Sequence, residues 1–319
     1  MSKLVTPKRV FFDTNHLIEM SNVLLGESRV NARRVAAYDR LLSGLCSGEI
    51  APVIAFRQPI EWHSGGAAAA HQIAAVLDRA PVRYLVGDHL LVYMLEALRE
   101  ALRLYGVSAS NLPEVLYDIT ARNEFNHFFG EQLLRDKGQW LGQQARIDAK
   151  WRSVRHIVDE QVNVAVLQRT DIEVERFAMY EVGLSQTQDG PVRRGIGPRD
   201  DVIGRLRRTE PFLALLRQFD IDPENESVWR GFELSNCPAL RLGSALWLRH
   251  ASHQKGRKAD PNDADDVSFV PAYVYSDFAL VEKSMRHLVH SSDQNLEKCV
   301  FSDAVHLIAN MFKRCTEVK

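Results

Sequence analysis

The chain has few cysteines and no long apolar run, and each shortage argues against a class of protein. Its four cysteines form no CxxC pair, so we expect reduced, mostly buried thiols and a cytoplasmic location. No stretch approaches the roughly 18 apolar residues that span a membrane, so we expect no membrane partner. The short apolar run after the basic start ends in an acid, and we expect no signal peptide. The net charge of -1 excludes a global basic field, so any nucleic-acid surface must be local.

Motifs of several common enzyme classes are also missing. The Gly-x-Ser-x-Gly motif of serine hydrolases is absent. The Gly-Ile-Gly segment at 195–197 lacks the third glycine and the preceding strand of a dinucleotide fingerprint. The pairs His250-x-x-His253 and His287-x-x-His290 have no third histidine or cysteine at ligand spacing, which argues against zinc. Carboxylate chemistry is the main candidate that is left.

Hydrophobic patterning predicts that strands and helices alternate at both ends of the chain, which indicates an α/β fold. Apolar and β-branched runs predict strands at 10–12, 51–56, 82–86, 278–281 and 300–301. Helices are expected at 16–25, 31–47, 59–79, 88–105, 209–219, 225–234, 238–250, 263–273, 282–290 and 303–314.

The segment 107–236 interrupts this alternation. Residues 111–180 are almost wholly helix-forming, 185–201 carry the glycines and prolines of a loop, and helices are expected again at 209–219 and 225–234. The segment is too long for a passive connection, so we expect an all-helical insertion. The pattern of the last helix predicts an inward face. That face would consist of Val305, Ile308, Ala309 and Phe312.

Carboxylates follow two of the predicted strands at the point where each strand ends. The run Val10 to Phe12 leads into Asp13, and the strand at 278–281 leads into Glu282. Carboxyl ends of parallel strands are where ligands bind in open α/β sheets. Like charges gathered there repel unless a cation neutralises them, and Mg²⁺ prefers oxygen ligands. Asp13 has a second interpretation as a helix N-cap, a position that Asp favours.

Further acidic residues are candidates for the same site. Glu61 lies in the opening turn of the helix that is expected after the second strand. Asp263 and Asp266 are three residues apart and therefore share a helix face, whereas Asp265 points elsewhere. An acidic first turn is also favourable for the helix dipole, so a purely structural role for these residues stays open.

Three motifs in this order resemble the PIN-domain nucleases, most closely their bacterial branch. The motifs are Phe11-Phe12-Asp13-Thr14-Asn15, Asp263-x-x-Asp266 and Tyr275-x-Asp277-x4-Glu282-Lys283. The resemblance covers roughly 8–106 and 237–315, and it departs from the family at Glu282, where Asp is usual. It implies an α/β/α sandwich around a short parallel sheet, in parts 1–106 and 237–319, with the helical insertion 107–236 between them.

The resemblance also implies a chemistry. Active PIN domains are mostly Mg²⁺- or Mn²⁺-dependent ribonucleases, so the implied activity is endonucleolytic hydrolysis of RNA phosphodiester bonds. Asn15 would orient Asp13 or hold a water at the cation. A toxin or phage-defence role is suggested by the family alone. The metal ligands carried over from the family are Asp13, Glu61, Asp263, Asp266 and Glu282.

Other functions fit some of the same residues. A catalytically inactive PIN-like module would keep the fold and bind nucleic acid or protein without metal. A DNA nuclease, acting on single-stranded DNA, stays open because metal chemistry does not distinguish the sugars. A haloacid-dehalogenase-type phosphatase is disfavoured because Asn15 stands where that family has a second Asp. A protein partner or a homodimer is compatible with each of these functions.

Two basic stretches are candidates for a nucleic-acid surface. Residues 191–217 are rich in arginine, and residues 241–258 contain basic residues and no acid. Arginine binds phosphate bidentately, and such contacts give affinity without sequence reading. Both stretches have a second interpretation as solvated helix faces. The residues expected to contact nucleic acid are Arg205, Arg207, Arg208, Arg249, Lys255, Arg257 and Lys258.

Overall fold

The computed structural model describes most of the chain outside the segment 120–201. The described residues are 6–56, 58, 61–62, 67–110, 112, 114–119, 202–204, 206–253, 267–293, 296 and 298–313. They belong to two compact units. The α/β unit contains the residues up to Asp88, residues 116–119 and the residues from Pro271 onward. The helical unit contains His89–Val115 and residues 202–270.

The sequence predicts boundaries at 106/107 and 236/237. In the structure the α/β unit contains the residues up to Asp88, residues 116–119 and those from Pro271 onward, and the helical unit includes helices from both sides of the predicted insertion. The reason is that helix α5 (His89–Leu104) packs against helix α14 (Pro238–His253) within the helical unit. Two helices that the sequence assigns to the α/β part therefore belong to the core of the helical unit.

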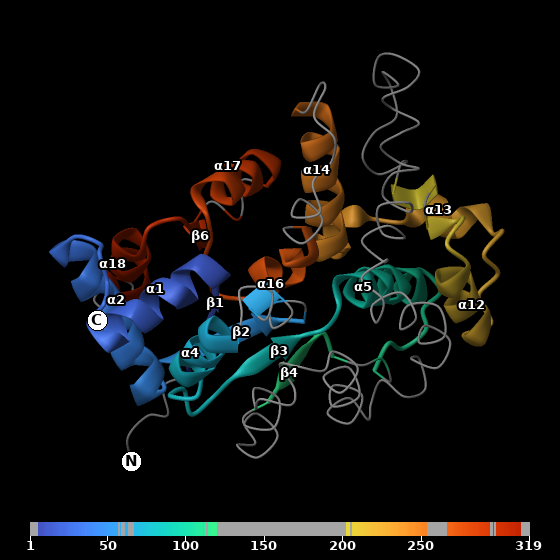
Figure 1. Ribbon diagram of the computed structural model, residues 1–319. Helices are drawn as coiled ribbons and strands as arrows, with labels where there is room; N and C mark the ends of the chain where they lie inside the picture. The colour runs from blue at the N-terminus through green and yellow to red at the C-terminus, as the bar shows by residue number, and fades with distance from the viewer. Residues whose placement is uncertain are drawn as a thin grey trace. The chain divides into compact units, whose positions relative to one another are not determined.

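A six-stranded sheet forms the α/β unit (Figure 1). The strand order is β4-β3-β2-β1-β5-β6, and all neighbouring pairs are parallel except β3 and β4. The expected α/β class with a mostly parallel sheet is confirmed. The strands are β1 (Lys8–Phe12), β2 (Ile50–Ala55), β3 (Tyr84–Val86), β4 (Leu116–Asp118), β5 (Phe278–Leu280) and β6 (Val300–Phe301).

Strand β1 lies in the middle of the sheet, and the direction of sheet growth reverses beside it. The chain adds β2 and β3 on one side of β1, and later adds β5 and β6 on the other side. The pairing of β1 with β5 aligns Phe12 with Leu280. In open α/β sheets, ligands bind at the carboxyl ends of the strands where the order reverses. That point lies between β1 and β5 in this chain.

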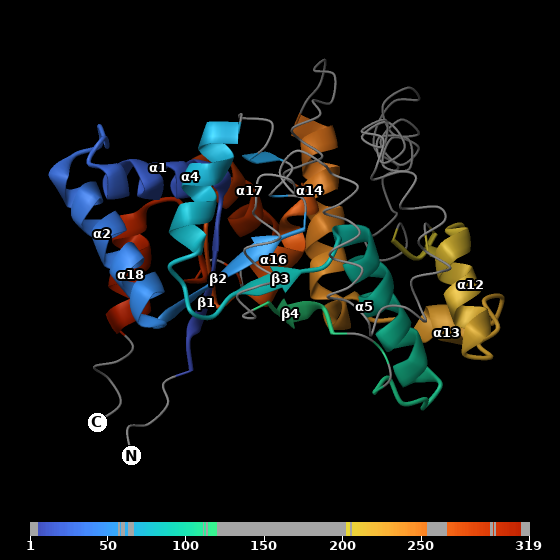
Figure 2. The same cartoon turned by 60° about the horizontal axis from the view of Figure 1, so that its bottom comes forward.

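The central strands are buried on both faces, which explains their continuous apolar sequence. Val10, Phe11 and Phe12 are buried, as is every residue of β2. The Phe11 ring packs edge-on against Tyr273 of α16 (Val270–Tyr275), with 5.2 Å between ring centroids. On the opposite face, the Lys8 ammonium donates a hydrogen bond to the Met311 carbonyl. In Figure 2, α1, α2, α4 and α18 lie to one side of β1.

The helices of the α/β unit follow the predicted positions closely. Asn31 caps α2, and Gly26 and Gly48 end α1 and α2 with left-handed φ values of 74° and 76°. The helices are α1 (Thr14–Leu25), α2 (Ala32–Ser47), α4 (Ala67–Leu77), α16, α17 (Lys283–Ser292) and α18 (Ala304–Lys313).

The inward face of α18 is not the one predicted. Ala304, Leu307 and Met311 are buried, whereas all four of the residues that were expected inward are half-buried. The Phe312 ring is held at the rim, where the guanidinium of Arg40 lies 4.0 Å from its centroid. The buried face is therefore displaced by about one residue from the predicted one, within a broad apolar stripe.

Strand β4 is a second correction, because it lies in the segment that was expected to be all-helical. It pairs antiparallel with β3, and its neighbours Val115 and Ile119 are buried. The backbone N–H of Ile119 donates to the Arg83 carbonyl at 3.0 Å and extends the pairing. Three residues at a sheet edge carry too little periodicity to be recognised, and the tertiary pairing decides their conformation.

An ion pair fixes β1 against β5 at the amino ends of the two strands. The Arg9 guanidinium donates to Asp277 at 2.9 Å, and the Arg9 backbone N–H donates to the same carboxylate at 2.8 Å. Burial raises the pKa of Asp277, but the hydrogen bonds and charge of Arg9 outweigh it and hold the pKa below its usual range. Asp277 therefore has a structural role at the end of β5 opposite Glu282.

The helical unit is built around α5. Leu98 and Leu102 of this helix pack with Phe212, Trp229 and Phe232. α5 is buried on more than one narrow stripe, since Val92, Ala97 and Ala101 are also inside. None of the helices in the described part of the chain has the length and apolar character needed to cross a bilayer. The remaining elements are α12 (Glu210–Gln218), α13 (Glu226–Gly231), the 3₁₀ helix η2 (Leu234–Asn236) and α14.

Two buried glutamates on α5 cap neighbouring helices. Glu96 accepts hydrogen bonds from the backbone N–H groups of Ala239 and Leu240, at 3.0 and 2.8 Å, in the first turn of α14. Glu100 accepts from the Glu233 backbone N–H and the Asn236 amide, and Arg103 pairs with it at 2.7 Å. Each carboxylate satisfies amides that a helix start leaves without a partner, which explains acids on a buried helix.

The described cysteines form no disulfide. Cys237 is buried, Cys299 is half-buried and Cys46 is exposed, so the expectation of mostly buried thiols holds for only part of this set. Burial raises the pKa of the Cys237 thiol, and the carboxylates of Glu96 and Glu100 raise it further. Cys237 is therefore a packing residue that stays protonated at neutral pH.

Replacing Glu96 with Gln should destabilise the helical unit by about 2–4 kcal/mol. The amide NH₂ of Gln would replace one carboxylate oxygen and leave one backbone N–H of α14 without an acceptor. Hydrogen exchange of the α14 amides should accelerate in this variant. Glu224, whose side chain is 83% exposed, provides the matched control, and Glu224→Gln should change stability by less than about 0.5 kcal/mol. Equal exchange rates in the two variants would contradict the capping role of Glu96.

Candidate functional site

The structure places Asp13 and Glu282 together at the switch point. Asp13 comes directly after β1, and Val281 separates Glu282 from the end of β5. Each acid is the N-cap residue of the next helix, α1 or α17. Their backbones are nearly identical, with φ/ψ of −61°/151° and −61°/156°. The two acids therefore occupy equivalent strand-to-helix junctions on adjacent parallel strands, as the sequence pattern predicts.

Asp13 is held by hydrogen bonds from both junctions. Its carboxylate accepts from the Thr14 backbone N–H at 2.7 Å and from the Glu282 backbone N–H at 3.3 Å. Its own N–H donates to the Leu280 carbonyl at 2.9 Å and continues the β1–β5 ladder. Asp13 is thus a helix N-cap, as one of the two interpretations expects, and its carboxylate also connects the two junctions.

The environment of Asp13 disfavours its charged form. Burial raises the pKa of the carboxyl group from 3.8 to about 6, and the nearby Glu282 carboxylate adds to this effect. The hydrogen bonds from the Thr14 and Glu282 backbones act in the opposite direction but do not cancel it. A cation at this point would offset the cost of burying the charged Asp13 carboxylate and the repulsion from Glu282.

Asn15 and Thr14 orient the other two carboxylates. The Asn15 amide donates a hydrogen bond to the Glu282 carboxylate, although Glu282 is the cap residue of a different helix. The Thr14 hydroxyl donates a hydrogen bond to the Glu61 carboxylate, which lies in a helical turn after β2. Three consecutive residues, Asp13 to Asn15, therefore contact Glu61, which follows β2, and Glu282, which follows β5. Asn15 binds Glu282, where the resemblance suggested an effect on Asp13 or on a water.

Two buried polar residues behind this edge were not identified from the sequence. His16 contacts the Tyr38 hydroxyl at 2.8 Å and the Val281 carbonyl at 3.2 Å, directly before Glu282. Burial lowers the pKa of His16, so the ring is neutral, donates from Nε2 to Val281 and accepts from Tyr38. Gln58 donates to the Phe12 carbonyl at 2.5 Å and accepts from the Ala55 backbone N–H at 3.3 Å. Both residues fix the ends of strands that carry the acids.

The oxygen donors at this edge fit a hard cation. Mg²⁺ is bound in proteins by one or two carboxylates together with waters and phosphate oxygens, and Asp13 and Glu282 supply two adjacent carboxylates. Within the described residues, no three His, Cys, Asp or Glu side chains are gathered so as to hold a metal ion by themselves. Asp263 and Asp266 lie outside the described residues, as does Asp265, so their part in the ligand set stays a prediction.

The predicted nucleic-acid contacts are described only in part. The Arg207 guanidinium pairs with Glu226 at 2.6 Å and lies 5.8 Å from the centre of the Trp229 ring. Its charge is already engaged within the helical unit, which weakens its case as a phosphate contact. Arg208 is exposed and donates to the Gly204 carbonyl at 2.8 Å. Arg205, Lys255, Arg257 and Lys258 lie outside the described residues, as does the side chain of Arg249 on α14.

Comparisons with protein-family models, with curated proteins and with solved structures found no match for this chain.

The raised pKa of Asp13 predicts the pH dependence of stability in the absence of metal. A proton binds Asp13 more tightly in the folded chain than in the unfolded chain, so protonated Asp13 stabilises the folded state. This stabilisation is fully present below about pH 4 and is lost as the pH rises through about 6. The loss is at most about 3 kcal/mol. The unfolding free energy of Asp13→Asn in EDTA should therefore rise relative to wild type between pH 4 and 8. A difference that is independent of pH would contradict the raised pKa.

Asp277→Asn is the control with the opposite sign. The folded-state pKa of Asp277 is lowered by Arg9, so its contribution is present above the unfolded pKa of about 4 and is lost as the pH falls. This variant should be less stable than wild type at neutral pH, and its deficit should shrink below pH 4. Urea titrations of both variants across the same pH series measure the two trends on chemically identical substitutions.

Proposed function

We propose that this chain is a metal-dependent endoribonuclease of the PIN-like type, with a Mg²⁺ or Mn²⁺ site at the carboxyl edge of its parallel sheet. The observation that carries the proposal is the pair Asp13 and Glu282 at the switch point of the sheet, with one acid following each of two adjacent strands. The order of the three sequence motifs that resemble PIN domains supports the same assignment.

The residues have different roles in this proposal. Asp13 and Glu282 would hold the cation, together with Glu61 and with Asp263 or Asp266. Asn15 donates a hydrogen bond to Glu282 and Thr14 donates one to Glu61, and these two contacts orient the carboxylates. When bound, Mg²⁺ or Mn²⁺ supplies an activated water nucleophile and offsets charge on the scissile phosphate.

Metal binding and proton release should be coupled at Asp13. A carboxyl group binds a cation only in its charged form, and the pKa of Asp13 is raised to about 6. Metal affinity should therefore rise between about pH 5 and 7. Each unit of pH below 6 should cost up to tenfold in affinity, since the cation must displace the proton.

RNA is the substrate that the resemblance favours, and single-stranded DNA is the alternative for the same chemistry. An inactive binding module is the alternative of a different class, in which these acids have only structural roles. The capping contact of Asp13 is the specific observation that favours it, because it gives this carboxylate a structural role without any cation.

The deciding experiment combines cleavage with metal-induced stabilisation. Labelled RNA and DNA oligonucleotides of one sequence should be incubated with wild type and Asp13→Asn, with and without Mn²⁺. We expect metal-dependent internal cleavage of RNA by wild type and a loss of at least about 100-fold in the variant, since even residues around a ligand often cost 10–100-fold. Mn²⁺ at 100 times its dissociation constant should stabilise wild type by about 2.7 kcal/mol.

Asp39→Asn is the matched control, because Asp39 is an exposed carboxylate on α2 and the chemical change is the same. It should keep both cleavage and metal-induced stabilisation. If Mn²⁺ leaves the melting temperature of wild type unchanged and no oligonucleotide is cut, the inactive binding module replaces the nuclease. Cleavage of DNA alone would keep the metal site and change the substrate.

A further inference from the structure

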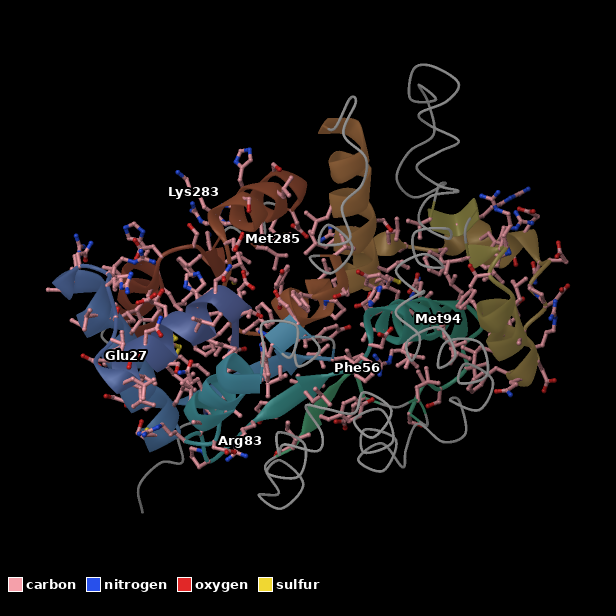
Figure 3. The ribbon with its side chains drawn as sticks, in the orientation of Figure 1. Glu27, Phe56, Arg83, Met94, Lys283 and Met285 are labelled. Atoms are coloured by element: carbon pink, nitrogen blue, oxygen red, sulfur yellow. The ribbon has the colours of Figure 1, made fainter. Side chains whose placement is uncertain are left out.

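Helix α17 begins directly after Glu282 and carries basic side chains on its outer face. Its ten residues contain no acid. Lys283, Arg286 and His287 are spaced by three and four residues and therefore share a face, on which Lys283 and His287 are exposed and Arg286 is half-buried. Figure 3 shows Lys283 on the outer side of the helix and Met285, which is buried, on the inner side.

The charges on this face have no acidic partner among the residues that the structure describes. No acidic side chain there forms an ion pair or hydrogen bond with Lys283, Arg286 or His287. Other basic residues of the chain differ, since Arg9 pairs with Asp277 and Arg40 pairs with Glu49 at 2.7 Å. The donors of α17 therefore face solvent or a ligand, whereas the donors of those arginines are already used.

The face is also fixed relative to the carboxylates. Met285 and Val289 are buried beneath it, and His290 hydrogen-bonds the Val300 carbonyl of β6 at 3.0 Å. The cap residue of the helix is Glu282, whose side chain is hydrogen-bonded to Asn15 of α1. Lys283 thus lies one residue from the acidic edge on an element that cannot move independently of it.

We propose that Lys283, Arg286 and His287 form a phosphate-backbone contact that leads a nucleic acid to the edge at Asp13 and Glu282. Carboxylates repel a polyanion, so a basic face beside them supplies the attraction that the edge lacks. Lys283 contributes a compact charge, and Arg286 contributes a planar pair of donors. Backbone contacts of this kind position a strand without reading its bases. The inference deepens the proposed nuclease function and rests on it for the route, but the binding itself is measured separately.

Binding should be measured in EDTA by fluorescence anisotropy, with fluorescein-labelled single-stranded RNA and DNA of one sequence, over a series of salt concentrations. Each phosphate contact on a single strand contributes about 0.7 to the slope of log affinity against log salt. Lys283→Gln should flatten the slope by about 0.7 and weaken binding about fivefold at 0.1 M salt. The double variant Lys283→Gln/Arg286→Gln should lose about 1.4 in slope and about 25-fold in affinity.

Arg79→Gln is the matched control, because it also removes one exposed positive charge from the α/β unit. Arg79 lies between α4 and β3, at the amino edge of the sheet, opposite the carboxylates. Salt screens charges beyond a Debye length of about 10 Å at 0.1 M, and Arg79 lies at the opposite end of the strands from Lys283, so this variant should change affinity by less than about twofold. Equal effects of Lys283→Gln and Arg79→Gln, or no binding of either oligonucleotide by wild type, would overturn the proposal.

Cleavage assays separate this inference from the proposed function. A wild type that binds through α17 but cuts neither oligonucleotide would refute the nuclease and keep the contact. If wild type cuts RNA with Mn²⁺, and the double variant shows the same cleavage and the same salt slope, the nuclease is supported and the contact is refuted. If RNA and DNA bind equally, the contact recognises the shared phosphate backbone, as proposed.

Discussion

The parallel pairing of β1 with β5 is the constraint on which the rest of the α/β unit depends. It aligns Phe12 with Leu280, which puts the two following acids at one edge. The pairing is fastened at the amino ends by Arg9 and Asp277, and at the carboxyl ends by the N–H of Asp13 on Leu280. A slip of one residue would turn the side chains of β5 to the opposite faces, and Glu282 would no longer meet Asn15.

Much of this arrangement was predictable because it depends on local signals. An apolar run that ends in a charge marks the end of a buried strand, and such runs identify both Asp13 and Glu282. Glycines such as Gly26 and Gly48 mark helix ends by their backbone preference. Short stretches of sequence therefore determine the strand-to-helix junctions. A parallel sheet then brings such junctions to one edge, because its strands all end on the same side.

What could not be predicted depends on contacts between distant residues. His16 and Gln58 are single polar residues in otherwise ordinary segments, and only the closed sheet shows that they bind the carbonyls of Val281 and Phe12. Glu96 resembles a surface residue of an amphipathic helix until α14 is placed against it. β4 exists because β3 offers an open edge. The membership of α5 and α14 in one unit has the same origin, since helix packing across about 140 residues leaves no local mark.

The position of β5 in the chain has a consequence for synthesis on the ribosome. Strands β1, β2 and β3 emerge early, but the partner that covers the other edge of β1 follows only after residue 277. At about 5–20 residues per second, this edge stays open for on the order of tens of seconds. An uncovered apolar strand is a template for pairing with other chains. The nascent chain must therefore be shielded during this interval, and its yield should depend on the rate of translation and on chaperones more than on the stability of the finished fold.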